Sequence, residues 1–144
     1  MFGGRQFATY DQGWIGWITQ KAIEIKNNTA NEAFTISGNG KQVRDLLYAS
    51  DCVALYLQAA SNIDTVKGQA FNIGGGIQNS YSLIELFQFL EKELETSIIY
   101  QKLSKRASDQ RVFVSDNNKI LSAVDSKPKV DKEDGKKRII NWLS

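Results

Sequence analysis

The stretch Gly38-Asn39-Gly40-Lys41-Gln42-Val43-Arg44-Asp45-Leu46-Leu47-Tyr48 combines a tight turn, a strand and an arginine. The two glycines around Asn39 predict a hairpin-like turn, because glycine adopts positive φ angles at little cost. The apolar residues of 43–48 predict a strand that Arg44 and Asp45 interrupt. A guanidinium at the mouth of a buried strand suits a phosphate or carboxylate ligand. Residue chemistry leaves a structural network between Arg44 and Asp45 open as the alternative.

Composition excludes several classes of function. The chain has 144 residues, of which 42% are hydrophobic and 24% charged, with a net charge of +2 and no histidine. Without histidine there is no Ser-His-Asp or Cys-His relay and no imidazole zinc site, and we expect no bound metal. Basic residues alternate with acidic ones, so we expect no nucleic-acid partner. The basic stretch 127–138 also contains acids and predicts a solvated helix face.

Cysteine content and hydropathy favour a cytoplasmic protein. Cys52 is the only cysteine and lies in an apolar run, so we expect a core residue in a reducing compartment. No apolar run reaches the length of a membrane span, and residues 1–5 lack the features of a signal peptide. We therefore expect no membrane partner.

Alternating strand and helix patterns predict an α/β fold in a single domain, residues 1–144. We expect strands at 34–37, 43–48, 70–73 and 97–100. We expect a first helix at 14–26 and a second that begins with a cap at Ser50 or Asp51 and runs to about Ala60. A third helix should begin at a capping box formed by Ser82 and Glu85. We expect a short helix capped by Asp116 and a final helix around 139–143. The second helix is apolar nearly all round, so we expect it to be buried. Trp14 and Trp17 share a face that is either core or interface, or stacks on a ligand.

Gly74-Gly75-Gly76 follows an expected strand and superficially resembles a dinucleotide fingerprint. Asn79 stands where the third glycine should be, and the next helix begins only at Ser82, too late to lie under a pyrophosphate. We therefore favour a simple turn and no cofactor site here.

A second polar cluster consists of Arg106, Asp109 and Arg111. With Arg44 and Lys41 it could surround a diphosphate, while Asp109 accepts a hydrogen bond from a sugar hydroxyl. The alternative is a solvated loop.

These motifs together resemble a known family. Residues 38–51 are similar to the G-x-G-x-Q-x-R-D-[FY]-[IV]-[YH]-V-x-D segment of extended short-chain dehydrogenase/reductases that act on nucleotide sugars, the NAD-dependent epimerase/dehydratase family. Residues 71–75 with 82–86 resemble the next landmark, and 106–109 resembles the R-x-x-D loop after it. The order and spacing match over essentially the whole chain. Within the family, 3–17 and 108–114 resemble the CDP-paratose 2-epimerase (CDP-tyvelose epimerase) branch.

The resemblance implies a C-terminal substrate-binding lobe, a small sheet with flanking helices in which most of the Rossmann sheet is absent. The family's Gly-rich NAD loop and Tyr-x-x-x-Lys pair are missing, so we expect no catalytic residue, no NAD bound by this chain alone and no activity of the isolated chain. The strand expected at 71–73 would expose an edge that favours self-association. The parent enzyme would be a homo-oligomer.

By the same resemblance, the parent enzyme uses NAD to oxidise and re-reduce a sugar carbon, in this branch carbon 2 of a CDP-linked dideoxyhexose in carbohydrate biosynthesis. The family's positions place Arg44, Arg106 and Arg111 on the diphosphate and Asp109 on a hydroxyl. The resemblance also implies that the strand of Phe34, Thr35 and Ile36 would lie alongside the base. The same lobe of a nucleotide-sugar 4,6-dehydratase or 4-epimerase, or a non-enzymatic binding module derived from one, remains the alternative.

Overall fold

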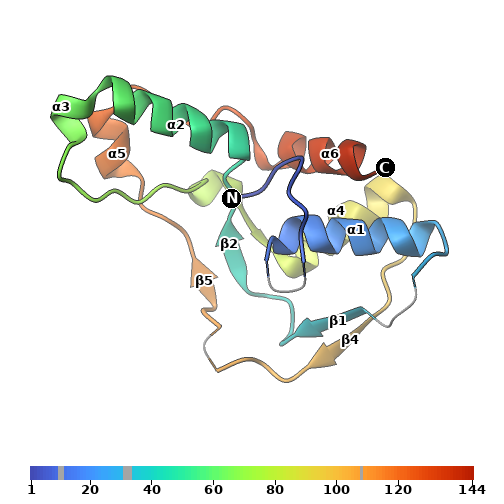
Figure 1. Cartoon of the computed structure of the whole chain (residues 1–144). Coiled ribbons are helices and arrows are strands. Elements are labelled where there is room, and N and C mark those ends of the chain that lie inside the picture. Colours follow the sequence, from blue (N-terminus) through green and yellow to red (C-terminus); the bar gives the residue numbers. More distant parts are fainter. Residues whose placement is uncertain (10–11, 31–33, 108) are drawn as a thin grey trace.

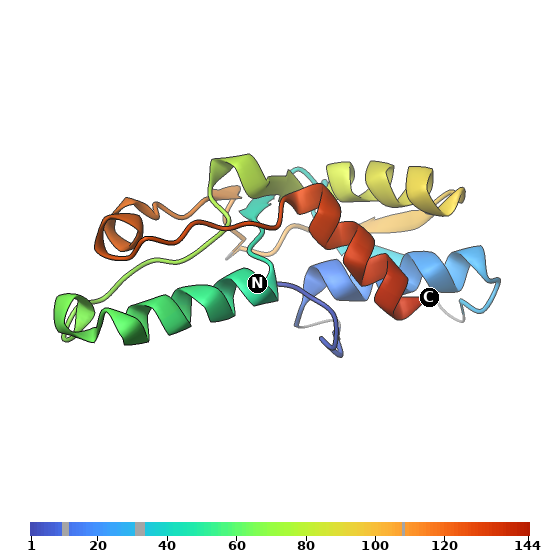
Figure 2. The same cartoon turned by 90° about the horizontal axis from the view of Figure 1, so that it is seen from above.

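The computed structural model of the chain describes residues 1–9, 12–30, 34–107 and 109–144. Tyr10, Asp11 and Ser108 belong to the motif stretches above but lie outside the described residues. The helices form two groups, seen to the right and to the left in Figure 1 and again from above in Figure 2. The right-hand group is α1 (Trp14–Lys26), α4 (Leu83–Leu94) and α6 (Lys132–Leu143), and the left-hand group is α2 (Ala49–Ser61), α3 (Ile63–Val66) and α5 (Asn118–Ala123).

Two small sheets lie below these helices in Figure 1. One pairs β1 (Phe34–Ser37) in parallel with β4 (Tyr100–Leu103). The other has the order β3-β2-β5, in which β2 (Val43–Asp45) runs antiparallel to β3 (Ser80–Ser82) and parallel to β5 (Val112–Phe113). The fold is therefore a small α/β arrangement with flanking helices, as expected.

The turn between β1 and β2 has the expected backbone but joins two different sheets. Gly38 and Gly40 have φ angles of 77° and 75°, as predicted. The prediction of a hairpin was wrong, because β1 pairs with β4 and β2 pairs with β3 and β5. The strand predicted at 43–48 ends at Asp45, after which Leu46 and Leu47 are buried outside any strand.

The main core lies between α1, α4, α6 and β1. Leu86 and Leu90 of α4 are fully buried, and α1 packs against both α4 and α6. The predicted capping box is confirmed: the Ser82 hydroxyl accepts from the Glu85 N–H at 3.3 Å, and the Glu85 carboxylate accepts from the Ser82 N–H at 2.7 Å. The Ser82 hydroxyl also donates to the Glu85 carboxylate at 2.6 Å. This side-chain hydrogen bond, followed by the one from the Ser82 backbone N–H, lowers the pKa of Glu85.

A smaller apolar cluster joins α2 to α3 and α5. Leu55, Val66, Ile120 and Val124 form its buried centre. The expectation that α2 is buried nearly all round was wrong, since Val53, Tyr56 and Leu57 are 57%, 67% and 64% exposed.

The start of α2 also differs from its prediction. Tyr48 occupies the N-cap position and makes no side-chain cap. The buried Asp51 carboxylate instead accepts from the backbone N–H of Val130 at 2.9 Å, and so holds the segment that leads into α6.

Two predicted strands are absent or displaced. Residues 71–73 are not a strand, because Phe71 and Ile73 pack against the smaller apolar cluster instead of joining a sheet. The strand edge that was expected to favour self-association is therefore not present. The strand expected at 97–100 begins only at Tyr100, and Ile98 is buried in the main core.

The basic C-terminal helix is not simply a solvated face. Lys136 is 1% exposed, and its Nζ lies 3.5 Å from the ring centroid of Tyr81 and 3.8 Å from that of Phe89. Glu133 pairs with this ammonium at 3.1 Å. A lysine can bury its long apolar stem when nearby groups compensate its charge. The mixture of acidic and basic residues in this stretch predicted a solvated face and gave no sign of this burial. In the described ranges, no helix has both the length and the hydropathy for a membrane crossing.

Candidate functional site

Arg44 and Asp45 bind different partners. Nη1 of Arg44 donates to the carbonyl oxygens of Val43 at 2.8 Å and Gln110 at 2.9 Å, which ties β2 to the loop before β5. Among the described residues, no ion pair joins Arg44 to Asp45. Each residue thus has a structural role of its own, and the guanidinium still lines a cavity, described below.

Asp45 organises the glycine turn. Its Oδ2 accepts from the N–H and the hydroxyl of Ser115, at 3.1 and 2.6 Å, and from the N–H of Gly76 at 3.3 Å. A Cβ on Gly74 would collide with Asp45 and Ser115, and one on Gly75 would collide with the carbonyl oxygen of Leu46. The glycines are therefore needed because protein segments approach closely.

The glycine turn does not fit the pyrophosphate of NAD. Gly74 is buried against its own protein, and the turn leads into a short 3-10 helix, Ile77–Asn79. Helix α4 begins only at Leu83. This agrees with the turn interpretation of the sequence.

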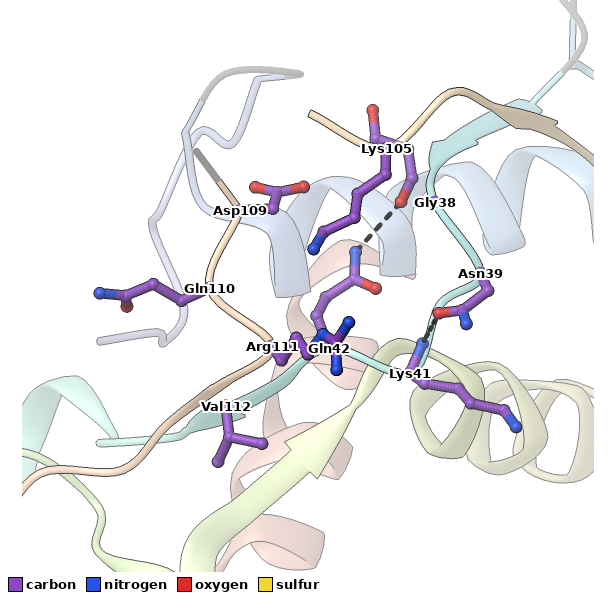
Figure 3. A pocket seen from close by; sticks show the side chains of 10 residues that line it. Gly38, Asn39, Lys41, Gln42, Lys105, Asp109, Gln110, Arg111 and Val112 are labelled. Carbon is purple, nitrogen blue, oxygen red and sulfur yellow. Dashed lines mark hydrogen bonds between the residues drawn. The ribbon is translucent and has the colours of Figure 1, made fainter. Parts of the chain in front are cut away.

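A first cavity of about 600 Å³ opens between the β1–β2 turn and the loop that precedes β5. In Figure 3, the Lys105 side chain turns toward the Gln42 amide, whereas Lys41 extends away from it. The Gln42 amide donates to the carbonyl oxygen of Ser37 at 3.2 Å. The lining consists of Ser37, Gly38, Asn39, Lys41, Gln42, Lys105, Asp109, Gln110, Arg111 and Val112.

A second cavity of about 480 Å³ adjoins the first. The two cavities share three residues, Ser37, Gln42 and Asp109. The second cavity combines apolar and charged groups, and its lining consists of Met1, Gly13, Trp14, Trp17, Ile18, Thr35, Ile36, Ser37, Gln42, Arg44, Asp45, Leu83, Arg106, Asp109 and Phe113.

The structure brings together all the predicted site residues except Phe34. Lys41 and Arg111 line the first cavity, Thr35, Ile36, Arg44 and Arg106 line the second, and Asp109 lines both. Phe34 lines neither cavity and is buried in the main core, where its ring centroid lies 5.3 Å from that of Trp17 and 5.6 Å from that of Phe87.

Basic side chains outnumber acidic ones in the first cavity, and the second cavity has as many arginines as acids. Lys41, Lys105 and Arg111 line the first cavity with one acid, Asp109. Arg44 and Arg106 line the second with Asp45 and Asp109, and Asp45 is already occupied by three hydrogen-bond donors. Arginine guanidinium groups are well matched to phosphate oxygens. In the parts of the chain that the structure describes, no cluster of three or more Asp, Glu, Cys or His residues could hold a metal ion.

Sequence reasoning left the role of Trp14 and Trp17 open and missed Leu83 and Phe113 as apolar walls of the second cavity. Trp14 and Trp17 pack against the main core, as one interpretation of their shared face predicted, and they also line the cavity. Leu83 and Phe113 come from other elements. Their helical or strand spacing predicts burial but cannot tell a core contact from a cavity wall.

Comparison with known proteins places the chain in a family. The sequence profile described as "NAD dependent epimerase/dehydratase family" matches residues 1–74. The chain belongs to the NAD-dependent epimerase/dehydratase family. This family member is 56% identical to a CDP-paratose 2-epimerase of Salmonella typhi over 144 residues, which are 100% of this chain and 42% of that epimerase. It is 31% identical to a mouse (Mus musculus) dTDP-D-glucose 4,6-dehydratase over 117 residues, 78% of this chain and 32% of that enzyme.

The fold of this epimerase/dehydratase chain also matches solved family members. The UDP-glucuronic acid 4-epimerase of Bacillus cereus, solved with UDP-glucuronic acid and NAD, has a TM-score of 0.83 and 22% identity, over 99% of this chain and 42% of that protein. The family is NAD-dependent, and NAD is present in this structure and in a second structure of the same Bacillus cereus epimerase. The chain thus spans less than half the length of these relatives.

Proposed function

We propose that residues 1–144 form the C-terminal, nucleotide-sugar-binding domain of an NAD-dependent epimerase that acts on a CDP-linked dideoxyhexose. The observation that carries this proposal is the gathering of Arg44, Arg106 and Arg111 around two adjoining cavities that meet at Asp109. The identity of 56% to a CDP-paratose 2-epimerase supports the CDP-linked substrate.

Each residue has a defined task in this proposal. Arg44 and Arg106 hold the diphosphate in the second cavity, where the backbone and side chains of Thr35 and Ile36 form the wall beside the nucleoside. Asp109, at the junction of the cavities, accepts a hydrogen bond from a ribose or sugar hydroxyl. Arg111 and Lys41 add positive charge from the first cavity. Phe34 supports this wall from the core and does not contact the base.

The task of this chain is positioning. NAD, held by another part of the enzyme, supplies the hydride chemistry. A diphosphate fixed by arginines keeps the nucleotide still while the hexose is free to turn and present its opposite face. A homo-oligomeric state, a cytoplasmic location and a role in carbohydrate biosynthesis belong to the same proposal.

Calorimetric titration of the chain with CDP, UDP and dTDP tests the proposal. We expect CDP to bind best. Arg44→Ala should reduce the binding free energy of CDP by roughly 1.5 to 3 kcal/mol, the value of a charge-assisted hydrogen bond. Because Arg44 also holds the Gln110 carbonyl, Arg106→Ala is a second variant, and it should give a similar loss. Arg138→Ala is the matched control, since Arg138 is exposed on α6 and pairs with Asp134 at 2.8 Å.

Two results would reject the proposed anchoring. One is the absence of binding for all three nucleotides. The other is CDP binding that neither arginine substitution weakens beyond the Arg138→Ala control.

The identity of 31% to a dTDP-D-glucose 4,6-dehydratase favours a second candidate, the same lobe of a nucleotide-sugar dehydratase or 4-epimerase. The same titration separates the two. A preference for dTDP or UDP over CDP, with the same loss in Arg44→Ala, would support this second function.

A further inference from the structure

The two adjoining cavities differ in the kind of surface they offer. Val112 is the only large apolar side chain that lines the first cavity among the described residues, and the rest of its wall is polar, charged or glycine. The second cavity has Trp14 and Trp17 from α1, with Leu83 and Phe113 from two other elements. A planar, weakly polar ring therefore finds aromatic and aliphatic walls only in the second.

The two tryptophans are not equivalent. The ring of Trp17 is packed against that of Phe34, with centroids 5.3 Å apart and planes tilted by 33°. Trp14 is half-buried, and among the described residues no second aromatic ring is packed against it. Trp14 thus has ring surface that a ligand can cover.

The backbone fixes the position of Trp14. It is the first residue of α1, and Gly13 before it has a φ angle of 73°. A residue with a side chain would be strained at this positive φ angle, and its Cβ would also have to displace the Gln6 side chain, whose Nε2 would lie 2.8 Å away. A ring held at a helix start by such a turn is already placed for stacking before any ligand arrives.

We propose that the nucleobase lies in the second cavity and stacks on Trp14, with Trp17 as part of the same wall. The inference rests on the proposed function and extends it by assigning Trp14 as the side chain on which the base stacks. The nucleotide then runs from the tryptophans, past Thr35 and Ile36, to the arginines at positions 44 and 106. Stacking accepts any base, so Trp14 contributes to affinity, and discrimination between bases depends on other groups.

Binding of two ligands to Trp14 variants tests this placement. CDP carries a base and inorganic pyrophosphate does not, so they separate base stacking from phosphate anchoring. We expect Trp14→Ala to lower the affinity for CDP by about 5- to 150-fold, the range found for one base stacked on an aromatic side chain. The affinity for pyrophosphate should stay unchanged. Trp14→Phe should restore most of the CDP affinity. Trp142→Ala is the control, because Trp142 packs edge-on against Phe7 and lines neither cavity.

Fluorescence gives a second measurement that does not need Trp14→Ala to fold. In a Trp17→Phe, Trp142→Phe double variant, Trp14 is the sole tryptophan. CDP should quench its emission at the concentrations that saturate binding, and pyrophosphate should not.

The outcomes separate the two proposals. CDP binding that is unchanged in Trp14→Ala, or a Trp14 emission that CDP leaves unaltered, would overturn the base placement and leave the nucleotide-anchoring function standing. An equal loss of CDP and pyrophosphate in Trp14→Ala would also overturn it. If the unmodified chain binds neither ligand, the proposed function itself fails.

Discussion

At the scale of single residues, Asp45 links three segments that are far apart in the sequence. One carboxylate oxygen accepts hydrogen bonds from Gly76 and Ser115, which are 31 and 70 residues away. The sequence predicted a turn at the glycines and a charged residue in the strand. It could not predict why the glycines are needed, because the close approach depends on partners that only the fold brings together.

Asp45→Ala should lower the free energy of unfolding by about 2 kcal/mol, because it leaves the part-buried donors of Gly76 and Ser115 without their charged acceptor. Asp116→Ala is the control. The Asp116 carboxylate is exposed and accepts from the Asn118 N–H at 2.9 Å, so its loss should cost about 1 kcal/mol or less. Urea unfolding followed by circular dichroism measures both. Equal losses would contradict the role assigned to Asp45.

Lys136 and Tyr81 should make stability depend on alkaline pH. Burial lowers the pKa of Lys136 from 10.5 to about 8, opposed by the hydrogen bond and charge of Glu133, while Lys132 lowers it and Glu85 raises it. Burial, with Glu133 and Glu85, raises the pKa of Tyr81 from 10.0 to about 12. Between pH 8 and 10 the unfolded chain therefore holds more protons than the folded one, because Lys136 is still protonated only when unfolded. Above pH 10 Tyr81 loses its proton in the unfolded chain but keeps it in the folded one, which reverses the difference.

We expect the free energy of unfolding to rise by about 2 kcal/mol between pH 8 and 10 and to fall above pH 10. Lys136→Met should abolish the rise, while Lys137→Met on the exposed side of α6 should keep it. Urea unfolding at a series of pH values tests this. A rise of the same size in Lys136→Met would contradict the assignment to Lys136.

At the scale of elements, predictions succeeded where the signal is local. The capping box of α4, the helical spacing of α1 and the strand β1 all lie within a few residues, and all are confirmed. Predictions failed where the structure of a segment depends on which other element packs against it. Helix α2 is apolar on most sides, and its sequence cannot tell which sides are covered in this chain. The segment 71–73 has the composition of a strand but packs on helices.

Two leucines of α2 provide a matched pair. Leu55 is 4% exposed in the smaller apolar cluster and Leu57 is 64% exposed. Leu55→Ala should lower the free energy of unfolding by about 2 to 5 kcal/mol, and Leu57→Ala should change it by about 0.5 kcal/mol or less. Chemical denaturation of both variants measures the difference. A large loss in Leu57→Ala would show that this face of α2 is covered in solution.

At the scale of the whole molecule, the candidate site is an arrangement of parts from both halves of the sequence. The motifs predicted which charged residues would meet, and Arg44, Arg106 and Asp109 do line one cavity. They did not predict that the site consists of two cavities, and the sequence left open whether the tryptophans face a ligand or the core. Those features depend on how the fold brings α1, β1 and the loop before β5 to one cavity, which no short motif encodes.

Mapping CDP on the chain by NMR would test the nucleotide-anchoring function most directly. Amide signals of the isotopically labelled chain are recorded as CDP is added. We expect the largest shifts at Trp14, at Thr35 to Ser37, at Arg44 and at Asp109, with the α2 and α5 signals unchanged. Shifts that are centred instead on the separate apolar cavity of about 180 Å³ between Leu55, Phe71 and Ile120, or no shifts at saturating CDP, would contradict a nucleotide site at the two adjoining cavities.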